Sequence, residues 1–216
     1  MLTKKNNIWV GTIVLTLVLI SGSTRAQAVA EAFRDISGTP FFPKTYVDVN
    51  GNPYLFDDFQ NSTVTLRNGS VLNNIKTNFN LVSNELLYID EKGQTMAASS
   101  STVQSVDVGF RKFVRSPAGN IFCEVISTEG KATLLRIYRK TLMETKAFNS
   151  ATVQKTFVTN ETHALLVDGK VTEVNSAKDI YETLASQDLE DFAKKEKLRS
   201  KSVASWVKIV NYYNTI

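Results

Sequence analysis

The chain contains very few residues that could act as a general base or a nucleophile. His163 is its only histidine and Cys123 is its only cysteine. Histidine is the commonest general base, so a histidine-dependent mechanism is limited to one position. His163 shares the strand parity of Leu165 and Val167 in an apolar segment. This pattern favours a histidine at the end of a strand without a catalytic role.

The lone cysteine cannot form a disulfide within the chain. Cys123 shares strand parity with Ile121 and Val125, which favours a small buried hydrophobic side chain over a reactive thiol. One histidine and one cysteine are too few for the four ligands of a structural zinc site built from these residues. No G-x-S-x-G nucleophile elbow and no H-E-x-x-H metalloprotease helix occurs. We therefore assign no catalytic, cofactor-binding or metal-ligating residue from the sequence, and we expect no cofactor.

Paired carboxylates leave one catalytic alternative open. Glycoside hydrolysis needs two carboxyl groups placed about 5 to 10 Å apart across a cleft. Asp57-Asp58 and Glu190-Asp191 are adjacent in sequence, and adjacent acids on a strand point to opposite faces. We expect the first pair in a turn and the second on the solvent side of a helix. Asp48–Asn52 resembles the start of a calcium loop, but Pro53 follows where the EF-hand pattern continues, so we expect an Asn-Gly turn.

Residues 1–28 have the three-part layout of a secretory signal peptide. A short basic start precedes a mostly apolar run at 8–20, and a small, polar stretch ends at Ala28. The apolar run is shorter than the roughly 20 residues that a spanning helix needs, so removal is expected rather than an uncleaved anchor. The expected cut follows Ala28, with Ala26 as the alternative. The protein is therefore expected to be exported, to the periplasm, the outer envelope or the medium.

The basic charge of the chain belongs largely to this leader. The chain has 25 Lys and Arg against 21 Asp and Glu, and Lys4, Lys5 and Arg25 precede the expected cut while no acid does. Removing residues 1–28 from the 216 leaves 188, with 22 basic and 21 acidic side chains. Nucleic-acid binding needs a clustered basic surface, so nucleic acid is not expected as a partner. A chain of this length can bury its own core.

The clearest β-hairpin signal lies at Thr63–Val71, where Asn68-Gly69 is a strong turn dipeptide. Parity is lost near Asn84, where we expect a bulge or a tight turn. After the first turn the apolar residues hold one parity and are expected on one face: Val71, Ile75, Phe79 and Leu81. Further turns are expected at Glu91-Lys92-Gly93, Pro117–Asn120, Thr128-Glu129-Gly130 and Asp168-Gly169. Strands are expected between them at 103–108, 121–126, 133–139, 154–159 and 163–167, and a serine-rich loop at Ala97–Thr102.

At about Asn175 the spacing of the apolar residues changes from the alternation of strands to the three- to four-residue repeat of helices. We expect three short helices at 177–185, 188–198 and 201–213, with N-caps at Ser176, Ser186 and Ser200 or Ser202. The apolar stripe that includes Trp206 is expected to pack on the core. The fold class is α+β: a signal peptide at 1–28, an N-terminal linker at 29–45, a mostly antiparallel β meander at 46–174 and a C-terminal helical segment at 175–216. The meander is expected to form a rolled sheet, a sandwich or a partial barrel.

Three segments carry a resemblance to a protein family. They are Gly51–Phe59, Ser62–Gly69 and Glu85–Ile89, and they are joined by a tail that reads Ile209-Val210-Asn211-Tyr212-Tyr213-Asn214. In these motifs the chain resembles uncharacterised secreted β-rich proteins with a helical C-terminal tail from Bacteroidota-type Gram-negative bacteria. The resemblance implies a periplasmic or outer-envelope location and a β domain with a helical tail. It implies no activity and no catalytic residue.

The residues favour a soluble, non-catalytic envelope protein that binds an unknown envelope protein or a small ligand. The first alternative is a carboxylate-dependent hydrolase acting on glycans. The second is an outer-membrane-associated structural protein, which the shortness of most expected strands disfavours, since membrane strands need about 9 to 11 residues. No integral span is expected after signal cleavage. An enclosed cavity in the sheet would favour ligand binding, and a filled interior would favour protein contact.

The signal peptide yields a direct prediction. N-terminal sequencing of the protein purified from the cells that make it is expected to start at Val29, or at Gln27 if the cut follows Ala26. Recovery of the chain with Met1 still attached would contradict export by a cleaved leader.

Overall fold

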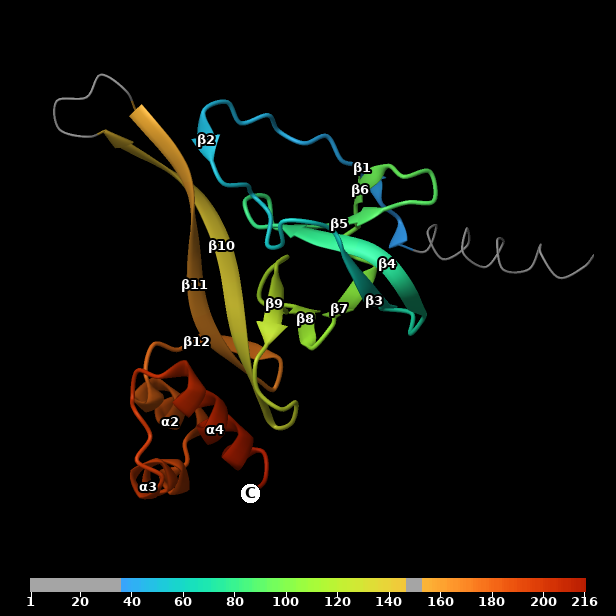
Figure 1. The fold of residues 1–216 in the computed structure, drawn as a ribbon. Helices are drawn as coiled ribbons and strands as arrows, with labels where there is room; N and C mark the ends of the chain where they lie inside the picture. Colours follow the sequence, from blue (N-terminus) through green and yellow to red (C-terminus); the bar gives the residue numbers. More distant parts are fainter. Residues whose placement is uncertain (1–35, 147–152) are drawn as a thin grey trace, which may run out of the picture.

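The computed structural model of the chain describes residues 36–146 and 153–216. Within these residues a single large sheet is followed by three helices, so the α+β class is confirmed. Figure 1 shows most of the shorter strands on one side of a long hairpin, with the helices packed at one end of it. The expected signal peptide and its cut lie outside the described residues.

The sheet is dominated by antiparallel pairing. Its strands are β1 (Thr39–Pro40), β2 (Val49–Asn50), β3 (Gln60–Leu66), β4 (Val71–Asn80), β5 (Glu85–Ile89), β6 (Thr95–Ala97), β7 (Val103–Val108), β8 (Arg111–Arg115), β9 (Phe122–Val125), β10 (Ala132–Lys146), β11 (Val153–Val167) and β12 (Lys170–Glu173). The order across the sheet is β1-β6-β5-β4-β3-β7-β8-β9-β10-β11-β12, and β2 pairs in parallel with β11. Most neighbours are also consecutive in sequence, as in a meander. β1 lies in the segment expected as a linker.

The sheet rolls up although its strand order is open. The backbone N–H of Lys140 on β10 donates to the carbonyl of Leu81, just after β4, at 3.2 Å. The Lys140 ammonium also donates to the carbonyls of Asn52 at 2.9 Å and Tyr54 at 2.6 Å. These bonds join the two sides of the roll. The mostly antiparallel meander expected from the sequence is therefore observed as an open sheet whose two sides are joined by these bonds.

Aromatic side chains fill the interior of the roll. Phe79 and Phe113 lie with their ring centroids 4.6 Å apart, and Phe122 lies 5.4 Å from Phe79. Val64, Val106 and other aliphatic side chains surround them with almost no exposure. The alternation of apolar and polar residues on β3 and β7 places these side chains inward. Burial of this apolar area is the main source of stability for the roll.

The prediction that Val71 shares one buried face of the strand with Ile75, Phe79 and Leu81 is wrong for Val71. Val71 is 55% exposed, whereas Ile75, Phe79 and Leu81 are buried as expected. Asn74 has a left-handed backbone with φ of 59°, and the pairing with β3 shifts at the same point. An extra residue in a strand reverses the alternation, so the side chains before the bulge point the other way. The turn expected near Asn84 is confirmed, with φ of 59° at that residue.

The strands β8, β10 and β11 differ most from expectation. β8 was not expected at all, and the expected strand at 133–139 extends to Lys146. The two strands expected at 154–159 and 163–167 are one continuous strand, β11. The polar stretch at Asn160–Thr162 stays extended because β10 pairs with it without a break in register. Its side chains also find partners, since Asn160 contacts Thr141 and Glu161 lies 3.5 Å from Arg136.

The three expected helices are present, and they enclose a second core against the sheet. They are α2 (Ala177–Leu184), α3 (Gln187–Lys195) and α4 (Val203–Tyr213). Ser176, Ser186 and Ser202 occupy the N-cap positions, and the Ser176 hydroxyl accepts a bond from the N–H of Asp179 at 3.3 Å. The expected packing of the α4 stripe is confirmed, because Trp206, Ile209 and Val210 are buried against the sheet. None of the described helices is long and apolar enough to cross a bilayer.

Asn214 at the end of the tail fixes α4 to the sheet. Its side-chain oxygen accepts from the N–H of Ala132 at 2.9 Å, and its nitrogen donates to the carbonyl of Ala132 at 2.8 Å. The side chain thus imitates a strand beside the first residue of β10. A Cβ atom at Gly130 would lie 2.6 Å from the Asn214 side chain, so only glycine leaves room for this contact.

A matched pair of phenylalanines tests the rolled core. Phe113 is 1% exposed, whereas Phe110, three residues earlier, is fully exposed. Phe113→Ala is expected to lower the free energy of unfolding by about 3 to 5 kcal/mol, because it leaves a cavity in the core. Phe110→Ala is expected to change it by no more than about 0.5 kcal/mol. Urea titration measures both, and equal losses would contradict the described core.

Candidate functional site

Cys123 is fully buried on β9, as the sequence predicted. Burial raises the pKa of its thiol to about 11, against small lowering effects of Arg139 and of the bond to Ser116. The thiolate is the nucleophilic form of cysteine, and it is scarce at neutral pH when the pKa is this high. Cys123 therefore contributes to packing.

The carboxylate pairs singled out in the sequence do not converge. Asp57 and Asp58 lie in an exposed bend between β2 and β3, as expected, and Asn52 donates to Asp57 at 3.3 Å. Glu190 lies on α3, where Lys194 pairs with it at 2.9 Å. The first pair belongs to the sheet and the second to the helical segment. Within the described ranges no group of three His, Cys, Asp or Glu residues could hold a metal ion.

The segment Asp48–Asn52 makes a turn and a short parallel strand. Gly51 has φ of 83°, which permits the expected turn, and a Cβ there would lie 3.7 Å from Phe157. Val49 and Asn50 form β2 beside β11, where Tyr46 and Phe157 meet edge to face at 4.9 Å. This segment, called the strap below, thus lies beside the part of β11 that contains Lys155 and Thr156.

A polar cluster that sequence reasoning missed lies between the two cores. Glu124 on β9 is 6% exposed, and Arg111 on β8 donates to both of its oxygens, at 2.7 and 3.3 Å. The Tyr138 hydroxyl donates to the same carboxylate at 2.6 Å, and Arg136 lies 3.5 Å from it. Glu124 sits within an apolar strand, and a single acid in such a run is the signal that could have revealed the cluster.

The partners of Glu124 keep it ionised. Burial alone would raise the pKa of the carboxyl, but the hydrogen bonds from Arg111 and Tyr138 and the charges of both arginines outweigh it, so the pKa is lowered. A general acid for glycoside cleavage needs a raised pKa and a free proton. Glu124 therefore acts as the anchor of a structural ion cluster, and no observation in the described residues favours the hydrolase alternative.

His163 lies inside β11 rather than at the end of a strand. It faces Arg136 across the ladder, and its ring meets Trp206 of α4 edge to face at 5.3 Å. Its buried Nε2 has no hydrogen-bond partner in the described part of the chain. Burial, and then the charge of Arg136, lower the pKa of His163, against a raising effect of Glu161. The imidazole is therefore held neutral between the ion cluster and the helices.

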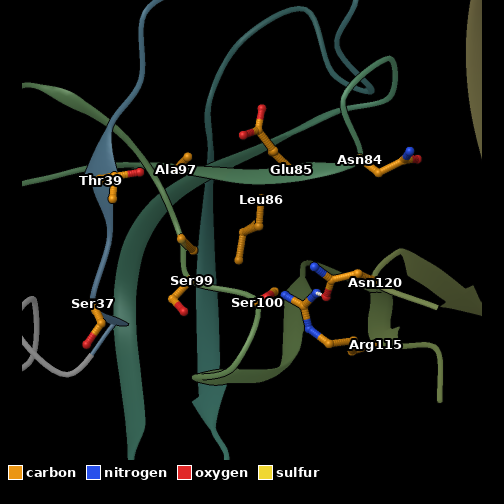
Figure 2. Close-up of a pocket in the computed structure, with 11 residues that line it drawn as sticks. Ser37, Thr39, Asn84, Glu85, Leu86, Ala97, Ser99, Ser100, Arg115 and Asn120 are labelled. Carbon is orange, nitrogen blue, oxygen red and sulfur yellow. Dashed lines mark hydrogen bonds between the residues drawn. The ribbon is translucent and has the colours of Figure 1, made fainter.

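A cleft opens on the surface at the β1 side of the sheet. Figure 2 shows residues of the β1 segment, the start of β5, the end of β6 with the loop after it, and the end of β8 with the turn that follows around it. Its volume is about 370 Å³. The residues around it are Ser37, Thr39, Asn84, Glu85, Leu86, Ala97, Ala98, Ser99, Ser100, Arg115 and Asn120. Sequence reasoning missed this site because its parts come from four separate stretches of chain.

The outer edge of β10, from Thr141 to Lys146, forms a second candidate surface. This part of the hairpin extends away from the rolled sheet and the helices (Figure 1). All of its residues are exposed, including Leu142 and Met143 at 40% and 48%, and Val153, opposite Lys146 on β11, is 43% exposed. β9 pairs with β10 only at Leu135 and Arg136, so β9 does not cover this edge.

Comparison of the chain with known protein families, with curated proteins and with solved structures gives no match.

The neutral His163 predicts a pH dependence of stability. The unfolded histidine titrates near its ordinary pKa of 6.5, and the folded one titrates lower. Between these values the unfolded chain binds more protons, so the free energy of unfolding falls as the pH falls through about 6.5. His163→Phe keeps a ring against Trp206 and is expected to flatten this dependence. Urea midpoints from pH 7 to pH 5.5 measure it, and an equal slope in both proteins would contradict the assignment.

Proposed function

We propose that this protein is an exported, non-catalytic envelope protein that binds another envelope protein through the outer edge of β10. The observation that carries the proposal is the exposed far half of the β10–β11 hairpin, which extends beyond both cores. The filled interior of the roll also supports protein contact over a ligand held inside the sheet.

The backbone of this edge has the chemistry of an unfinished sheet. The N–H of Lys140 points away from β11, because it donates to Leu81. Backbone groups alternate in direction along an antiparallel strand, so the N–H groups of Leu142 and Glu144 point the same way. Neither has an acceptor among the described residues. An extended segment of a partner would supply acceptors and add a strand here.

The side chains and the strap favour the same use. Leu142 and Met143 offer apolar contacts on the two faces of the added strand, since neighbours on a strand point to opposite faces. The strap at Asp48–Asn52 pairs with β11, so the other side of the hairpin is already partly occupied. The edge of β10 is therefore the open side. Glu144 and Lys146 add charges that restrict which strands can pair there.

The test uses two matched edge substitutions. Glu144→Pro removes one outward N–H of β10 without removing a bond to β11. Glu173→Pro is the control on β12. The N–H of the next residue, Val174, donates to the carbonyl of His163 on β11 at 2.9 Å, so the N–H of Glu173 points away from β11 and its loss removes no bond within the sheet. A photo-crosslinking amino acid in place of Met143, used in the cells that make the protein, is expected to capture one reproducible envelope protein. Glu144→Pro is expected to lower capture at least about tenfold, and Glu173→Pro to leave it unchanged.

Circular dichroism checks that both proline variants are folded. Equal capture by Glu144→Pro and the unchanged protein would contradict strand addition at β10. Capture of nothing but a second copy of the chain, or of no protein at all, would contradict an envelope partner at this edge.

A further inference from the structure

The surface cleft contains a positively charged side chain that is held in place from several sides. The guanidinium of Arg115 lies over the ring of Phe122, 4.3 Å from its centroid. Its Nε donates to the carbonyl of Val103 at 3.3 Å, and its Nη1 donates to the side-chain oxygen of Asn120. Figure 2 shows Arg115 and Asn120 directed toward each other beside Ser100. A side chain fixed in this way loses little further freedom when it binds a ligand.

Arg115 has no carboxylate partner among the described residues. A guanidinium has five N–H donors, and the two bonds above use two of them. Glu85 is the acid among the residues that line the cleft. The Ser83 hydroxyl donates to its carboxylate, and Figure 2 shows that carboxylate pointing away from Arg115. Burial, and then the charge of Arg67, lower the pKa of Arg115, so the environment lacks a compensating negative charge.

The rest of the cleft is lined by hydroxyl and amide groups, by Glu85, and by the aliphatic side chains of Leu86, Ala97 and Ala98. Ser100 and Asn120 lie beside Arg115, Ser99 lies between Ser100 and Ser37, and Ser37 and Thr39 lie across the cleft on the β1 side (Figure 2). Leu86 projects between them. Hydroxyls and amides of this kind bond the hydroxyl groups of a sugar, and a planar guanidinium bonds a carboxylate through two parallel N–H groups. The volume of about 370 Å³ is in the range of small-molecule sites.

We propose that this cleft binds a small hydroxylated carboxylate of the sugar-acid class, with the carboxylate on Arg115 and the hydroxyl groups on the serine and asparagine side chains. The site is independent of the β10 edge, because its residues come from the β1 segment, the start of β5, the end of β6 with the loop after it, and the end of β8 with the turn that follows. No bond is made or broken in the ligand.

The test measures binding of three probes to the purified protein by isothermal titration calorimetry. Galacturonate is expected to bind, and galactose, which lacks the carboxylate, is expected to bind at least about tenfold more weakly, as befits a lost charge-assisted bond. Inorganic phosphate tests whether a bare oxyanion suffices. Galactose binding as tight as galacturonate, or phosphate binding with no response to galacturonate, would overturn the sugar-acid assignment.

Two variants test whether binding depends on the guanidinium of Arg115 itself or only on positive charge at the protein surface. Arg115→Gln is expected to weaken galacturonate binding about 10- to 100-fold. Arg139→Gln removes an exposed arginine of β10 outside the cleft and is expected to leave binding unchanged. Amide shifts in the NMR spectrum of the unsubstituted protein give a second measurement that needs no variant. Galacturonate is expected to shift Ser100 and Asn120, and binding without shifts at these residues would overturn the site.

Discussion

The pairing of β10 with β11 is the interaction on which the rest of the structure depends. The ladder runs without a break from Ala132 opposite Val167 to Lys146 opposite Val153. The half of the ladder next to the helices contributes side chains to both cores. Tyr138 belongs to the rolled core, and Leu134 and Leu165 belong to the helical core. The two cores are therefore joined by one rigid element. The same ladder continues beyond both cores, which leaves its far half as an exposed edge.

The ion cluster lies where the sheet changes from one core to the other. Phe113, Glu124, Arg136 and His163 stand side by side across β8, β9, β10 and β11. The row thus begins in the rolled core and ends against Trp206 of the helical segment. Burying a charge is costly unless it is paired, and Glu124 has two arginines and a tyrosine around it. Polar pairing fixes the angle between the cores more narrowly than apolar contact would, because hydrogen bonds are directional.

Local signals made much of the fold predictable, and long-range contacts made the rest unpredictable. The turn at Asn68-Gly69 and the capping serines act within a few residues, so the sequence shows them directly. The exposure of Val71 depends on a bulge at Asn74, and the length of β11 depends on register with a strand far away in sequence. Arg115 gave no signal either, because its isolation from carboxylates is visible only once the chain is folded.

The cleft depends on a close contact at the β1 edge of the sheet. β1 pairs with β6 through only two residues, and the hydroxyl of Thr102 donates to the carbonyl of Ile36 at 2.7 Å. A Cβ atom at Gly38 would lie 2.2 Å from the Tyr88 hydroxyl, so the backbone can lie this close to the sheet only because residue 38 is glycine. The distance between Ser37 and Arg115 across the cleft is set by that approach. Any larger residue at position 38 would move the β1 wall outward, and the hydroxyl groups of a ligand held by Arg115 would lose their partners on that side.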